Sequence, residues 1–409
     1  MYSYYNQQAY MSNRVYIAGA GIISAIGNNI TENLAALESG QAGMGEMQYL
    51  SSVHRGKIPV AEVKMDNAGL AALSGLPSHY SRTALLSAIA AEEALANAAV
   101  PGFSTLRSGF ISANTVGGMD KTENFFADFL AGPGRGKLRN VVHHECGAAT
   151  EIVADLLGIK HHISTISTAC SSSANAIFSG ARLIRQGVLD VVIAGGTDAL
   201  TKFTLNGFNT LMILDNRYCQ PFDENRRGLN LGEGAGYIVM VSEKVAQTLS
   251  SAPCCTLSGY CNANDAYHQT ASSPDGTGSY LAMKGALEKS GLDPGKIDYI
   301  NLHGTGTQNN DIAEGTAIKL LFEGKYPPMS STKSFTGHTL GASGGIEAVY
   351  SVLSVRHGLI YPNLRFETPM KELPFTPETT FKKDAAICNV LSNSFGFGGN
   401  CSSLVFSKV

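Results

Sequence analysis

The apolar positions of the chain fall into short runs, and the segments between these runs have a different spacing. The runs are rich in valine, isoleucine and glycine and predict buried strands at residues 15–21, 108–114, 162–167, 188–196, 236–243, 298–304 and 403–408. Between them lie alanine-rich segments with helical periodicity, at residues 81–98, 171–187 and 278–291. Strands that alternate with helices predict an α/β fold.

The order of elements in the second half of the chain resembles that of the first. Strand, glycine turn and long helix recur after about residue 258, although no repeated sequence is visible. This order predicts two similar halves, at residues 13–258 and 259–409. A polar, tyrosine-rich stretch at residues 1–12 is expected to form a flexible N-terminal tail.

The composition indicates one large globular unit. The 409 residues are 44% hydrophobic and 15% charged, which is enough apolar material for a large core. A net charge of −3 without a long basic stripe argues against nucleic acid as the main partner. No apolar run reaches the roughly 20 residues of a membrane span, and the polar start does not resemble a signal peptide. We therefore expect neither a nucleic-acid nor a membrane partner.

The eight cysteines lack the C-x-x-C pairs of zinc sites and the density of a disulfide scaffold. This distribution favours a reducing, cytoplasmic location, and we expect no metal and no cofactor.

Gly19 and Gly21 form half of a dinucleotide fingerprint, but Ser24 replaces the third glycine, so a strand-to-loop glycine turn is the preferred interpretation. The consecutive residues His-His-Glu at 143–145 do not predict a metal site, because adjacent side chains point apart and no third ligand is indicated.

Cys170 stands between β-branched residues and a run of small residues at 171–176. This pattern predicts a strand that turns into a helix at the cysteine. A thiol at a helix N-terminus meets unpaired N–H groups and the positive end of the helix dipole, which favour the nucleophilic thiolate. For a cysteine on its own, a buried structural thiol is the alternative.

Two glycine-rich segments supply possible partners for Cys170. His303 closes an apolar strand and precedes a turn of glycine and threonine, which places it at the rim of a sheet, where α/β active sites lie. Lys333 and His338 belong to the glycine-rich segment 330–345, where absent side chains allow a substrate arm to come close. Taken alone, His303 fits a buried core histidine equally well.

The segment 393–400, NSFGFGGN, alternates phenylalanine with glycine shortly before the last strand. Glycines on both sides of Phe397 free its backbone to direct an N–H into a pocket. A gate or an oxyanion-hole donor is the preferred interpretation, and a plain turn is the alternative.

Together these segments resemble the elongating β-ketoacyl-acyl-carrier-protein synthases, the condensing enzymes of fatty acid and polyketide assembly. The resemblance extends over nearly the whole chain after residue 12. It rests on the motifs STACSSS (167–173), IAGGTD (193–198), LGEGAG (231–236), DAYHQT (265–270), HGTGT (303–307), TKSFTGH (332–338) and NSFGFGG (393–399). It implies a thiolase-like fold with two similar halves in five layers, αβαβα, usually as a homodimer.

The resemblance also implies a role for each motif residue. Cys170 matches the nucleophile that accepts the acyl group, and the N–H groups of Cys170 and Phe397 match the oxyanion hole. His303 and His338 match the two histidines that stabilise the enolate left when malonyl thioester loses CO2. The chain would then grow by two carbons on an acyl carrier protein.

Further matches concern residues around the site. Lys333 and Glu314 match a buried ion pair that orients His303, and Phe395 and Thr270 are expected at the oxyanion hole and gate. The channel for the pantetheine arm is expected at Thr305, Thr307, Gly398 and Gly399.

Two segments depart from the family pattern. Asn400 and Cys401 replace the usual Thr-Asn beside the gate. The segment 130–149 is also unusual, and its Arg135, Lys137 and Arg139 are expected to dock an acidic carrier protein; a solvated loop is the alternative.

Two other functions stay open: a cysteine thioesterase or hydrolase, and a non-catalytic partner that sets chain length in a heterodimer. Acyl length and pathway are left undetermined by the sequence.

Overall fold

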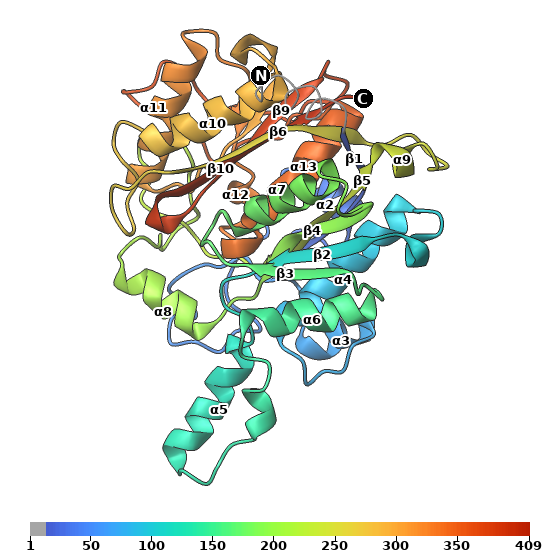
Figure 1. The fold of residues 1–409 in the computed structure, drawn as a ribbon. Coiled ribbons are helices and arrows are strands. Elements are labelled where there is room, and N and C mark those ends of the chain that lie inside the picture. Colours follow the sequence, from blue (N-terminus) through green and yellow to red (C-terminus); the bar gives the residue numbers. More distant parts are fainter. Residues whose placement is uncertain (1–13) are drawn as a thin grey trace.

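The computed structural model describes residues 14–409 as a mixed α/β fold (Figure 1). The N-terminal tail expected at residues 1–12 lies outside the described residues. The strands are β1 (Val15–Ser24), β2 (Ser108–Ala113), β3 (His162–Ile166), β4 (Val191–Asp198), β5 (Gly234–Ser242), β6 (Cys255–Asn264), β7 (Tyr299–Asn301), β8 (Met329–Ser330), β9 (Asn389–Phe395) and β10 (Asn400–Ser407). The helices are α2 (Ile30–Ser39), α3 (Asn67–Ser74), α4 (Arg82–Ala98), α5 (Met119–Ala131), α6 (Cys146–Leu156), α7 (Ser172–Arg185), α8 (Lys202–Thr210), α9 (Glu243–Ala246), α10 (Thr277–Ser290), α11 (Gln308–Phe322), α12 (Lys333–Thr336) and α13 (Ser343–His357).

One strand order occurs twice along the sheet. The order is β3-β2-β4-β5-β1 in the first half of the chain and β8-β7-β9-β10-β6 in the second, and β1 pairs with β6 at the junction. The pairing directions repeat as well, because β2 is parallel to β3 and β4 as β7 is to β8 and β9. The chain is therefore a duplicated unit. The boundary expected at residue 258 stays a prediction, and β6 runs across that position.

Two central helices lie between the two halves of the sheet. Both α7 and α13 contact strands from each half, whereas α4 and α6 cover the outer face of the first half and α10 covers that of the second (Figure 1). This arrangement gives the expected five layers, αβαβα. Helix α13 is buried from Ser343 to Val355 because it packs against strands on both sides. A Cβ at Gly345 would lie 2.4 Å from the Gly236 carbonyl oxygen, so close packing of α13 on β5 requires glycine there.

The glycines of β1 serve packing and not a turn, so the turn expected at Gly19 and Gly21 is wrong. Both lie within the strand, where a Cβ would lie 2.5 Å and 2.1 Å from carbonyl oxygens of Ala94 and Ala90 in α4. Their absent side chains let α4 approach the strand closely.

Two features of the first half remain exposed. Strand β3 forms one edge of the sheet. Helix α5 and the segment that returns from it project from the body as an arm (Figure 1), which carries exposed apolar side chains at Phe126, Phe129, Leu130, Leu138 and Val142. Within residues 14–409, no helix is long and apolar enough to cross a membrane.

Candidate active site

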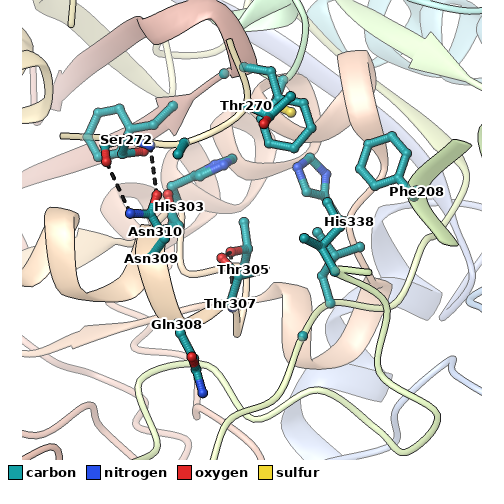
Figure 2. A pocket seen from close by; sticks show the side chains of 18 of the residues that line it. Phe208, Thr270, Ser272, His303, Thr305, Thr307, Gln308, Asn309, Asn310 and His338 are labelled. Carbon is teal, nitrogen blue, oxygen red and sulfur yellow. Dashed lines mark hydrogen bonds between the residues drawn. The ribbon is translucent and has the colours of Figure 1, made fainter. Parts of the chain in front are cut away.

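A cavity of about 310 Å³ brings the predicted site residues together (Figure 2). Cys170 and Phe208 reach it from the first half of the chain, and His303, His338 and Phe395 reach it from the second. The site therefore lies where the two halves of the molecule meet.

Cys170 lies in the connection between β3 and α7, as the sequence pattern predicts. Ala169 adopts a left-handed conformation with φ of 53°, and Thr168 and Cys170 form an isolated β-bridge around it. Such a conformation is unfavourable for a residue with a side chain and persists only where surrounding contacts enforce it. The tight turn places the sulfur at the base of the cavity, where Cys170 is 5% exposed.

The thiol and the two histidines form a compact group. The sulfur of Cys170 and one ring nitrogen from each of His303 and His338 all lie within 4.8 Å of one another. The two imidazole rings are nearly perpendicular, with centroids 5.4 Å apart. A single small acyl group can therefore contact the sulfur and both rings at once.

Hydrogen bonds fix the orientation of both imidazoles. The Lys333 ammonium lies 3.2 Å from Nδ1 of His303, and because an ammonium only donates, Nδ1 accepts. Nδ1 of His338 accepts from the Leu340 N–H at 3.1 Å and lies 3.0 Å from the Ser343 hydroxyl. In each neutral ring the proton is therefore on Nε2. Both histidines present an N–H donor to the cavity.

Burial keeps the two rings uncharged. Burial lowers the pKa of His303 well below its usual value, and the charge of Lys333 and the neighbouring His338 lower this pKa further. Burial and the Lys333 charge likewise lower the pKa of His338. A ring whose Nε2 bears a proton has no lone pair there for a metal ion. The Cys-His-His group therefore fits a carbonyl oxygen better than a cation.

The ion pair expected between Lys333 and Glu314 is wrong. Lys333 pairs instead with Glu347 of α13, a residue that no motif singled out, and both side chains are almost fully buried. The second carboxylate oxygen of Glu347 has no partner among the described residues. Burial raises the pKa of Glu347 to about 7, although the Lys333 charge opposes this shift.

Glu314 supports His303 through the main chain. Its carboxylate accepts the N–H of His303 at 2.9 Å, the N–H of Gly304 at 2.8 Å and the side-chain amide of Asn393 at 3.0 Å. Burial raises the pKa of Glu314 to about 7, while these hydrogen bonds lower it. Glu314 thus fixes the backbone from which the His303 ring projects.

The expected activation of Cys170 by a helix N-terminus is outweighed by burial. Burial raises the pKa of the thiol to about 11, whereas the Lys333 charge and a hydrogen bond with the Phe397 N–H lower it. The hydrogen bond places the Phe397 N–H beside the sulfur; its role as an oxyanion-hole donor stays a prediction. The resting thiol is protonated at neutral pH.

Aromatic rings and threonines line the way to the sulfur. Phe397 stacks on Phe208 of α8 with ring centroids 5.8 Å apart, and Phe395 lies beside His303 with centroids 5.9 Å apart. The cavity is also lined by Thr270, Thr305 and Thr307 (Figure 2), and their roles at the gate and in the pantetheine channel stay predictions.

Other predicted positions lie outside the lining. Gly398 and Gly399 do not line the cavity; they hold the Phe397 loop through bonds to Gln269 and Asp265. Arg135, Lys137 and Arg139 belong to the arm and do not line the cavity either.

Comparison with known proteins decides the family. The N-terminal domain of β-ketoacyl synthases matches residues 12–246, and the C-terminal domain matches residues 254–367. The chain belongs to the β-ketoacyl synthase family. This synthase is 32% identical over 406 residues to 3-oxoacyl-[acyl-carrier-protein] synthase 2 of Staphylococcus aureus strain N315, covering 97% of this chain and 98% of that protein.

Solved structures agree with this assignment. The synthase resembles the ishigamide ketosynthase/chain length factor with a TM-score of 0.91 and 26% identity, over 97% of this chain and 99% of that one. It also resembles a type II polyketide ketosynthase, AntDE, solved with its acyl-carrier protein, AntF, with a TM-score of 0.86 and 25% identity, over 97% and 100% of the two chains. The synthase therefore has the thiolase-like fold and is a condensing acyltransferase.

Sequence patterns missed three residues of this synthase site. Phe208 lies on α8, which no motif marked, and Glu347 lies on α13, buried beside Lys333. Arg227 lines the cavity but stands in a polar stretch of the sequence without periodicity. Glu347 is the only acidic residue of helix 343–357 and stands among apolar neighbours; this was the one usable signal, because a buried charge requires a partner.

Proposed function

We propose that the protein is a β-ketoacyl-acyl-carrier-protein synthase that extends an acyl chain on Cys170 by two carbons. The observation that carries this proposal is the meeting of one thiol and two outward-directed imidazole N–H groups in a single cavity. Acyl transfer requires a nucleophile, and decarboxylation requires donors for an enolate oxygen. The cavity supplies both.

The first step transfers the acyl group. The sulfur of Cys170 attacks the acyl thioester, and the carbon–sulfur bond to the carrier arm breaks. The proton of Cys170 passes to the departing carrier sulfur, so that the carrier leaves as a free thiol. The carbonyl oxygen becomes negative in the transition state, and the N–H groups of Phe397 and Cys170 are its expected donors. Removing one such donor typically lowers the rate by about 10² to 10³.

The second step breaks malonyl thioester. The bond to the carboxylate carbon breaks, CO2 leaves, and its electron pair forms an enolate whose negative oxygen accepts hydrogen bonds from Nε2–H of His303 and His338. The Lys333 ammonium, 3.2 Å from Nδ1 of His303, adds positive potential on that side. Neutral rings suit this step because they donate without giving up a proton.

The third step joins the two fragments. The enolate carbon attacks the acyl carbon on Cys170, a new carbon–carbon bond forms and the carbon–sulfur bond to Cys170 breaks. The released thiolate takes up a proton from water. The product is a β-ketoacyl chain, two carbons longer, on the carrier. Hydrolysis is disfavoured because a cysteine hydrolase needs an imidazole nitrogen that accepts a proton, whereas Nδ1 of each ring already accepts a hydrogen bond.

The proposed partners are an acyl carrier protein and a second subunit. One similar ketosynthase was solved with its acyl-carrier protein, and another is described with a chain length factor. Among residues 14–409, β3 is an edge strand without a second neighbour, and the arm carries exposed apolar side chains; both features support burial against a second chain. We propose a homodimer, with a heterodimer as the alternative. A cytoplasmic location stays a prediction, supported by eight cysteines without a disulfide.

The reaction is tested with purified protein, acyl-carrier and malonyl-carrier substrates. We expect CO2 and a β-ketoacyl product in equal amounts, and a Cys170→Gln variant that still releases CO2 without forming the product. Free fatty acid as the main product would favour a hydrolase. Inactivity that ends only when a partner chain is added would favour the non-catalytic heterodimer subunit.

A further inference from the structure

Asn400 stands at the foot of the Phe397 loop, as the first residue of β10. Its side-chain oxygen Oδ1 accepts three hydrogen bonds, from the Ser171 hydroxyl at 2.6 Å, from the Asn175 amide at 2.8 Å and from the Asn262 amide at 2.7 Å. One donor follows the nucleophile directly, one lies in the first turns of α7, and one lies on β6. A single oxygen thus joins three elements behind the site.

The same network holds the turn that carries Cys170. The Asn175 amide also donates to the Thr168 hydroxyl at 2.8 Å. The Ser171 hydroxyl has a single proton, which it shares between Asn400 Oδ1 and the Thr168 carbonyl oxygen, 2.8 Å away. The Ser402 hydroxyl of β10 donates to the side-chain oxygen Oδ1 of Asn175 at 2.6 Å. The residues before and after Cys170 are therefore both linked to Asn400 through short hydrogen bonds. A network of hydrogen-bonded, partly buried side-chain amides makes the surrounding backbone more rigid.

The main chain of Asn400 holds the second oxyanion donor. Its carbonyl oxygen accepts the Gly396 N–H at 2.9 Å, and Phe397 follows directly. A Cβ at Gly396 would lie 3.2 Å from the Cys170 nitrogen, so the loop packs directly on the nucleophile turn. The opposite side of the loop is held by hydrogen bonds with Gln269, Asp265 and Asn264 and by the stacking of Phe397 on Phe208.

We infer that Asn400 is a positioning residue that sets the spacing between the Cys170 and Phe397 N–H groups and so forms the oxyanion hole. The inference rests on the proposed function, because it assigns a role in the acyl-transfer step of that reaction. Asn400 touches neither substrate nor the reacting atoms. It acts through the two loops that its side chain and main chain hold together.

The test separates acyl transfer from decarboxylation in the same protein. Acyl transfer uses the Cys170 and Phe397 donors, whereas CO2 release depends on His303 and His338. We expect Asn400→Ala to slow acylation of Cys170 by an acyl-N-acetylcysteamine thioester about tenfold to a hundredfold, with unchanged KM. A misaligned oxyanion-hole donor should lower the rate by no more than complete removal of that donor would. Release of CO2 from malonyl thioester should stay within about twofold of the parent protein.

A conservative variant distinguishes positioning from loss of folding. All three hydrogen bonds are accepted by Oδ1, which aspartate retains, so Asn400→Asp should restore acylation to within about threefold of the parent. Ser171→Ala, which removes one of the three donors, should give an intermediate loss. Equal losses of acylation and CO2 release in Asn400→Ala, or a parent-like acylation rate, would overturn the inference. If the proposed function itself is wrong, the parent protein will form no β-ketoacyl product.

Discussion

The Lys333 ammonium lies between two buried groups, Nδ1 of His303 at 3.2 Å and the carboxylate of Glu347. The first contact determines which nitrogen of His303 faces the substrate. The second contact offsets the cost of burying a positive charge, which would otherwise be several kcal/mol. One side chain thus links stability to the direction of the hydrogen-bond donor that we propose for the enolate.

Replacing Lys333 by alanine leaves Glu347 buried without its cation. We expect the free energy of unfolding to fall by about 3 to 5 kcal/mol and CO2 release from malonyl thioester to fall by at least about tenfold, because His303 loses the group that fixes its tautomer. Urea unfolding and a CO2 assay measure the two effects. Lys333→Ala combined with Glu347→Ala should recover much of the stability but none of the activity.

The same series tests the corrected ion pair. In double-mutant cycles, Lys333 and Glu347 should be coupled by about 1 to 3 kcal/mol, whereas Lys333 and Glu314 should be additive within about 0.5 kcal/mol. A stronger coupling to Glu314 than to Glu347 would restore the pairing expected from the motifs.

Alkylation of Cys170 should accelerate strongly with pH. Only the thiolate reacts, and with the pKa raised to about 11 its fraction below that pKa rises tenfold for each pH unit. Peptide mass spectrometry after iodoacetamide treatment from pH 6.5 to 10 measures the rate at Cys170, with exposed Cys388 as internal control. A rate that levels off near pH 7 would show that the helix N-terminus prevails over burial.

Release of CO2 should persist at mildly acidic pH. Because the pKa of both His303 and His338 lies well below 6.5, the rings stay neutral and their Nδ1 atoms stay unprotonated as pH falls through 6.5. In the Cys170→Gln variant, which removes titration of the thiol, protonation of the rings should cause no loss of CO2 release between pH 6 and 8; a change centred at about pH 7 would report Glu314 and Glu347 instead. A loss of activity with a midpoint near pH 6.5 would indicate ordinary, solvated imidazoles.

The docking prediction concerns Arg135, Lys137 and Arg139 on the arm. Changing all three to glutamate should raise KM for malonyl carrier protein about tenfold, because rim charges mainly affect the encounter with an acidic partner. The rate with malonyl-N-acetylcysteamine should not change, since none of the three lines the cavity. An unchanged KM for the carrier would assign docking to another surface.

Local patterns in the sequence were sufficient for much of the fold. Strands such as β1 and β5 and helix α4 are strongly apolar or strongly periodic, so their secondary structure and burial can be predicted from their own residues. Strand β6 was missed because CTLSGYCNAN mixes polar and apolar residues; it pairs with β1 and β10 near the centre of the sheet. Its strand character depends on neighbours that are distant in sequence.

By itself the sequence determined the repeated α/β order and pointed to the three groups of the proposed chemistry, Cys170, His303 and His338. Each ends a strand or opens a turn whose glycines and small residues are visible locally. Only the tertiary structure decided the partner of Lys333, the direction of the two imidazoles and the protonated state of the thiol. The physical reason is that ion pairs, tautomers and pKa values depend on burial and on atoms from separate elements, and these are brought together only when both halves pack around α7 and α13.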